Sequence, residues 1–130
     1  MGILTSSELN TILASSDNGL ILKQAIQAGI PAFRRGLAER GRSAPVLLKD
    51  EGFQFVLTRQ QLSNLCSWYL DGQLDSVELE YCANLLELSE DFEIEMRLLD
   101  ELYRLGTPEL AGELTPSVVQ SIRDRLLGAA

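Results

Sequence analysis

The stretch of the chain that decides its fold runs from Asp71 to Glu109 and reads DGQLDSVELEYCANLLELSEDFEIEMRLLDELYRLGTPE. It carries twelve carboxylates against two arginines, a net charge of −10 in a chain whose total is −8. Apolar residues recur between these charges at helical spacing. The stretch is therefore acidic and also apolar enough to form part of a core. Its carboxylates are Asp71, Asp75, Glu78, Glu80, Glu87, Glu90, Asp91, Glu93, Glu95, Asp100, Glu101 and Glu109.

Two helices are predicted inside this stretch. Asp75 caps the first, and Glu78 at the third helical position completes a capping box. Ser89 caps the second, which is predicted to run from Glu90 to Leu105. Two adjacent apolar seams of this second helix are expected to face inward: Phe92, Met96, Leu99 and Tyr103 in one, and Ile94, Leu98, Leu102 and Leu105 in the other. Its outward face is expected to pair Glu93 with Arg97 and Asp100 with Arg104.

Further helices are predicted on both sides of the stretch. A capping box at Thr58 begins a helix that Gly72 ends, and helices after 107 and 115 follow, the last ending at Gly128. Short helices are predicted from Thr5, over 20–28 and over 31–40. Two β-like runs, 45–49 and 53–57, flank a loop that suits a hairpin because glycine stands at its positive-φ position.

These elements define one domain over residues 1–130. We predict a mainly α helical bundle of about six or seven helices with one β-hairpin near residues 45–57. Short helices occupy residues 1–44, and the bundle proper occupies residues 58–127.

The sequence contains no histidine. Its absence excludes Ser-His and Cys-His nucleophilic pairs and the common zinc sites, so we expect no enzyme, metal or cofactor. Acid–base chemistry by paired carboxylates is the minor enzymatic alternative. Cys66 and Cys82 are predicted to be buried free thiols, with a disulfide between adjacent helices as the alternative. No apolar run reaches the roughly 18 residues of a membrane span, and no signal-peptide pattern opens the chain, so we expect a cytoplasmic protein.

Negative charge is segregated along the chain, since residues 1–70 carry a net +2 and residues 110–130 carry none. One interpretation is a solvated face that keeps the protein soluble. The other is a docking surface for a basic partner, because unpaired like charges cost the folded state some self-repulsion. On the second interpretation the candidate partner-binding residues are Trp68, Glu80, Glu87, Glu93, Asp100 and Glu101.

A basic segment is formed by Arg34, Arg35, Arg40 and Arg42. We expect these arginines to pair with carboxylates of the same chain or of a second copy, because an acidic protein repels nucleic acid at long range. Trp68 lies outside the apolar arc of its helix and is either a core-edge residue or an interface anchor. Glu95 stands between the two seams and is expected to reach water; if buried, it needs a partner.

The segment WYLDGQLD, Trp68 to Asp75, continues into ELEYCANLLEL, Glu78 to Leu88. A helix, a glycine-containing turn and a second acidic helix in this order resemble the small acidic helical immunity proteins of bacteria, of the colicin and contact-dependent-inhibition type. The resemblance covers roughly residues 58–127, and no functional residue is carried over from it. It implies a protein that binds and blocks a cognate toxin, often a nuclease with a basic active-site groove.

Two hypotheses of function follow from these observations. The first is a protein-binding module, in particular an immunity-type inhibitor, whose acidic helices cover a basic partner such as a cognate toxin. The alternative is a self-associating structural or accessory protein without catalytic activity, in which the basic segment meets the acidic stretch of a second copy in a homodimer. Neither hypothesis involves nucleic acid or a membrane.

Overall fold

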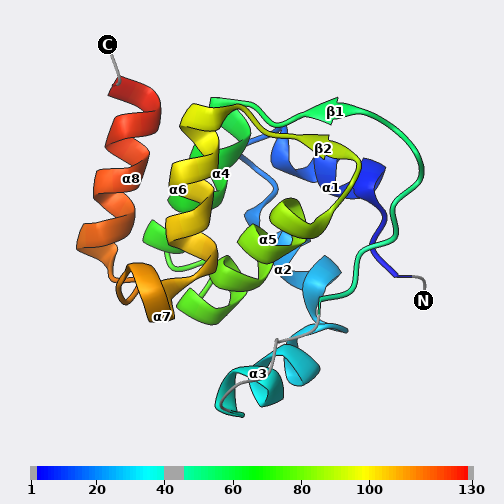
Figure 1. Ribbon diagram of the computed structural model, residues 1–130, viewed down its shortest axis with the longest axis horizontal. Helices are drawn as coiled ribbons and strands as arrows, with labels where there is room; N and C mark the ends of the chain where they lie inside the picture. The colour runs from blue at the N-terminus through cyan, green and yellow to red at the C-terminus, as the bar shows by residue number, and fades with distance from the viewer. Residues whose placement is uncertain (1–2, 40–45, 129–130) are drawn as a thin grey trace.

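The computed structural model describes residues 3–39 and 46–128, and most of these residues are helical (Figure 1). The mainly α prediction is confirmed. The helices are α1 (Ser6–Leu13), α2 (Gly19–Ile26), α3 (Ile30–Ala38), α4 (Arg59–Leu70), α5 (Ser76–Leu88), α6 (Met96–Gly106), α7 (Pro108–Ala111) and α8 (Pro116–Gly128). The strands are β1 (Phe55–Val56) and β2 (Phe92–Glu93). Two arginines of the basic segment, Arg40 and Arg42, lie outside the described residues. Pro45, the first residue of the predicted hairpin, also lies outside them.

Local hydrogen bonds explain where α1, α4 and α5 begin. In each case the capping side chain accepts the N–H of the third helical residue, whose own side chain accepts the N–H of the capping residue. These capping boxes satisfy amides that a helix start otherwise leaves without a partner. The pairs are Thr5–Glu8, Thr58–Gln61 and Asp75–Glu78, as predicted.

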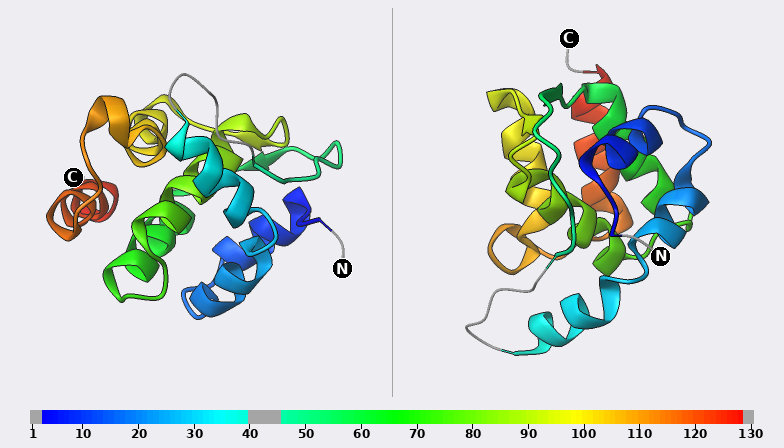
Figure 2. Two further views of the ribbon diagram at one scale, coloured as in Figure 1. Left: turned by 90° about the horizontal axis from the view of Figure 1, so that it is seen from below. Right: turned by 90° about the vertical axis from the view of Figure 1, so that its right-hand side faces the viewer.

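The core lies among α4, α5, α6 and α8, with α1 and α2 beside α4 (Figures 1 and 2). α4 packs most extensively on α8, and α5 on α6. α3 lies at one end of the molecule, where the ring of Phe33 meets that of Tyr81 on α5 edge to face at 5.1 Å. Buried apolar residues from α1 to α8 join one cluster, so the N-terminal helices share the core of the bundle.

Three side chains of α4 form hydrogen bonds with the backbone at the end of α1 and just after it. They donate to carbonyl oxygens at 3.1, 2.9 and 2.9 Å. The bonds run from Gln61 to Asn10, from Asn64 to Leu13 and from Trp68 to Ser16. Because the last carbonyls of a helix have no partner within it, the donors to Asn10 and Leu13 satisfy groups that the packing of α1 on α4 would leave without water, and Trp68 does the same for the turn after α1.

The β structure differs from the predicted hairpin in its pairing. A small β element is present near residues 45–57, but β1 pairs in parallel with β2, so that Phe55 lies opposite Phe92. Lys49 forms a separate parallel bridge with the residue that precedes α1. Gly52 has the predicted positive φ, +81°. The chain nevertheless continues beside a distant segment after this glycine, and β1 does not pair with the described residues 46–49.

Helix α6 begins later than predicted, at Met96 and not at Glu90. Ser89 follows the last residue of α5 in an extended conformation and does not cap α6. The chain then forms β2 before α6 starts. Glu93 therefore precedes the helix, and the predicted helical pair of Glu93 with Arg97 is not formed.

The carboxylate of Asp91 accounts for both differences. Asp91 is 3% exposed and accepts hydrogen bonds from Ser6 Oγ at 2.5 Å and from the backbone N–H groups of Glu51 and Gly52 at 2.6 and 3.2 Å. It thereby joins the start of α1, the loop before β1 and the turn after α5. The hydrogen bond from Ser6, and next the one from the Glu51 backbone, hold the pKa of Asp91 below its usual value against the opposing effect of burial.

We expect Asp91 to make the stability of the protein depend on acid pH. Because its pKa is lower in the folded state than the roughly 3.9 of an unfolded aspartate, its contribution is fully present above that pH and is lost as the pH falls through the folded-state value. Urea unfolding should show Asp91→Asn to be less stable than the wild type at pH 7, with a smaller difference at pH 3. Glu90→Gln, at an exposed position next to it, is the control and should follow the wild type. A deficit of Asp91→Asn that is equal at both pH values would contradict this role.

Candidate functional site

Three of the six residues predicted to bind a partner are buried. Trp68 is 1% exposed, Glu80 7% and Glu101 6%. The indole N–H of Trp68 is already bonded to the backbone of Ser16, so Trp68 is a core residue and offers no surface anchor. The prediction that these three residues bind a partner is therefore wrong, because their side chains are not accessible on the folded protein.

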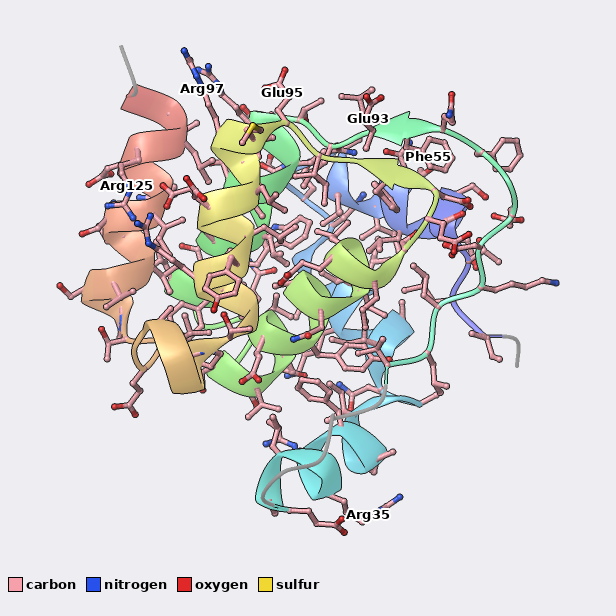
Figure 3. The ribbon with its side chains drawn as sticks, viewed as in Figure 1. Arg35, Phe55, Glu93, Glu95, Arg97 and Arg125 are labelled. Carbon is pink, nitrogen blue, oxygen red and sulfur yellow. The ribbon has the colours of Figure 1, made fainter. Side chains whose placement is uncertain are left out.

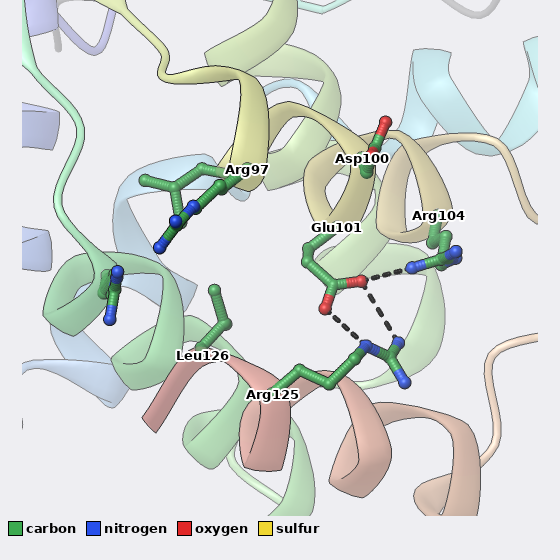
Figure 4. Close-up of a pocket in the computed structure, with 8 residues that line it drawn as sticks. Arg97, Asp100, Glu101, Arg104, Arg125 and Leu126 are labelled. Carbon is green, nitrogen blue, oxygen red and sulfur yellow. Dashed lines mark hydrogen bonds and ion pairs between the residues drawn. The ribbon is translucent and has the colours of Figure 1, made fainter. Parts of the chain in front are cut away.

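The buried side chain of Glu101 links α6 to α8. It accepts two hydrogen bonds from Arg125, at 2.6 and 3.1 Å, and one from Arg104 at 2.5 Å (Figure 4). The sequence predicted that Arg104 would pair with Asp100. In the structure Arg104 pairs with Glu101 instead. A carboxylate held by two guanidinium groups is neutralised within the chain and adds little to an acidic docking face.

Glu87 lies half-buried where α5 meets α6. Its Oε1 has no hydrogen-bond partner among the described residues, and burial raises the pKa of its carboxyl group. Gly106 leaves room for this oxygen, since a β-carbon at that position would clash with it. The nearby Asn84 donates to the carbonyl oxygen of Gly106 at 3.0 Å. Glu87 is therefore part of the α5–α6 contact and does not stand free in solvent.

Basic residues of the N-terminal third neutralise two more carboxylates of the acidic stretch. Lys23 on α2 lies 2.8 Å from buried Glu78, and Arg34 on α3 lies 2.9 Å from Asp75. The expected pairing of the basic segment with the chain's own carboxylates is confirmed for Arg34. Arg35, at the far end of α3, is exposed (Figure 3).

Exposed carboxylates gather near the start of α6. Glu93 on β2 and Glu95 just before α6 lie along one end of the molecule, beside Arg97 (Figure 3). Glu95 is exposed, as expected. Asp100, one turn further along α6, is also exposed. Of the predicted partner-binding residues, Glu93 and Asp100 are thus the two that present exposed side chains.

An apolar stripe runs along the exposed face of α6 and consists of Met96, Leu99 and Tyr103, which are 83%, 43% and 43% exposed. Their spacing places them on one side of the helix. The seam opposite is the buried one, with Leu98 at 1% and Leu102 at 0% exposure. The sequence predicted both seams to be core; of the first seam only Phe92 is buried, and the other three members are exposed. We call Met96, Leu99 and Tyr103 the α6 stripe.

The remaining chemistry of the described residues is limited. Cys66 and Cys82 are buried free thiols, as predicted, and burial raises the pKa of Cys66 to about 12 and that of Cys82 as well, so both stay protonated at neutral pH. In residues 3–39 and 46–128 no group of three or more potential ligand side chains is placed to hold a metal ion. No helix in the same residues has the length and apolar character to cross a membrane.

Comparisons with models of protein families, with curated proteins and with solved structures gave no match to this chain. The surface of the described residues has two distinctive features, the α6 stripe and a cluster of arginines from α4, α6 and α8.

Replacement of Glu101 should test whether this residue acts inside the fold. We expect Glu101→Gln to lower the free energy of unfolding by about 1–3 kcal/mol, because it weakens charged hydrogen bonds to two arginines that are themselves half-exposed. Asp100→Asn, on the exposed side of the same turn, is the matched control and should change stability little. Urea unfolding of both variants is the measurement. Equal stability of Glu101→Gln and Asp100→Asn would contradict the proposal that Glu101 stabilises the contact of α6 with α8.

Proposed function

We propose that this chain is a protein-binding module that takes its partner on the α6 stripe. The observation that carries the proposal is the exposure of Met96, Leu99 and Tyr103 on one helix face. The free energy falls when a partner covers apolar side chains that are otherwise exposed to water, so such residues favour binding. Methionine and tyrosine are also enriched in protein interfaces, where a few such anchors supply most of the affinity.

The charge around the stripe favours a basic partner. The chain has a net charge of −8, and Glu93, Glu95 and Asp100 are exposed near the stripe. Such charges speed the encounter with a protein of opposite charge and contribute more to specificity than to affinity. An immunity-type inhibitor that blocks a basic toxin or nuclease is the particular form of this function that we propose. In it the apolar stripe provides the anchors and the carboxylates form the rim.

The test begins with a partner captured by the immobilised chain from its source cell and then purified. Binding of that protein is measured by surface plasmon resonance for the wild type, Leu99→Asp and Leu20→Asp. Leu20 is a matched control because it is 60% exposed but lies on α2, away from the stripe. We expect Leu99→Asp to weaken binding at least about tenfold, or 1.4 kcal/mol, and Leu20→Asp to leave it unchanged.

Charge reversal addresses the rim of the same surface. Glu95→Lys and Asp100→Lys should lower the association rate, and the loss should shrink as salt is added, because exposed charges are screened. A partner that is acidic, or one that binds Leu99→Asp as well as the wild type, would overturn the proposal. Sedimentation separates the self-association alternative, since a dimer that Leu99→Asp dissociates would assign the stripe to a second copy.

A further inference from the structure

A cavity of about 480 Å³ lies beside α6 and α8 and is lined by four of the chain's nine arginines (Figure 4). Arg59 comes from α4, Arg97 and Arg104 from α6, and Arg125 from α8. Three helices that are separate in the sequence therefore bring guanidinium groups to one place. This is a concentrated positive site on a protein whose net charge is −8.

Two of these arginines stand where a helix disfavours a cation. Arg59 is the first residue of α4, and Arg97 is the second of α6. The N-terminus of a helix carries a partial positive charge, so a cation in the first turn costs some tenths of a kcal/mol where an acid would stabilise. The fold accepts this cost twice around one cavity, which concentrates positive potential there.

The carboxylates in the cavity wall do not balance the arginines. Glu101 is shared by Arg104 and Arg125, which remain 48% and 50% exposed. Arg59 and Arg97 form no ion pair within the described part of the chain. With Asp100 and Glu101 as its carboxylates, the lining carries four positive and two negative charges, an excess of +2.

We propose that this cavity binds a small organic phosphate monoester, with its phosphate group among the four guanidinium groups. A phosphate monoester carries a charge near −2 at neutral pH, which matches the excess of the lining. Guanidinium groups bond phosphate oxygens in pairs through their planar N–H donors. Leu98 and Leu126 supply the apolar part of the wall, against which the organic group lies. The site is separate from the α6 stripe and does not depend on it.

Isothermal titration calorimetry of the full chain at low salt tests the proposal, with phenyl phosphate and inorganic phosphate as probes. We expect phenyl phosphate to bind, and to bind more tightly than inorganic phosphate because of the apolar wall. Arg59→Gln and Arg97→Gln should each weaken its binding at least about tenfold without lowering stability, since neither arginine holds the fold through an ion pair. Arg35→Gln, an exposed arginine on α3, is the control and should bind like the wild type.

The source of the phosphate group is distinguished by a second arm. Vesicles that contain phosphatidic acid, compared with vesicles of phosphatidylcholine alone, test a lipid headgroup; binding to the former that Arg97→Gln abolishes assigns the phosphate to a lipid. Binding of phenyl phosphate without vesicle binding assigns it to a soluble molecule. The proposal is overturned if millimolar phenyl phosphate gives no heat, if succinate binds as tightly, or if Arg35→Gln is impaired as much as Arg97→Gln.

Discussion

Burying an ionised carboxylate costs much free energy unless hydrogen-bond donors or cations compensate it, and this constraint acts at three buried acids of the fold. Glu78 forms an ion pair with Lys23 of α2, and Glu101 forms one with Arg125 of α8. Asp91 accepts a hydrogen bond from Ser6 of α1. Each of these buried acids therefore joins the acidic stretch to a different part of the chain. Part of the acidic stretch thus holds the fold together from within, while Asp71, Glu90, Glu93, Glu95 and Asp100 remain exposed.

Because several acids are used inside, α6 presents different chemistry on its two exposed sides. The α6 stripe is apolar and lies near the exposed carboxylates of Glu93 and Glu95. The arginine cavity lies on the side that faces α8. A protein that is acidic overall thus has an exposed apolar stripe, which we propose binds a basic protein, and an arginine-lined cavity, which we propose binds a small anion.

The features that could be predicted from the sequence are those set by neighbouring residues. The capping boxes at Thr58 and Asp75 are local, and so were found correctly. Ser89 is also a favourable capping residue but lacks the Glu or Gln three positions later, and the segment after it is instead joined to the distant loop before β1 by hydrogen bonds to Asp91. Likewise, nothing near Glu101 in the sequence reveals that Arg125 neutralises it. The arginine cavity has no linear motif, and Arg97 falls in the first turn of its helix only because α6 starts later than predicted.

The most direct test of this account is carboxyl footprinting of the native protein, in which carbodiimide-activated glycine ethyl ester labels accessible acids and mass spectrometry measures each site. We expect slow labelling of Glu78, Asp91 and Glu101, which are buried, and fast labelling of Glu90, Glu93 and Glu95, which are exposed. Urea-unfolded protein should label all six at similar rates. Fast labelling of Glu78, Asp91 and Glu101 in the native state would show that these carboxylates form an outer face, and the account would be wrong.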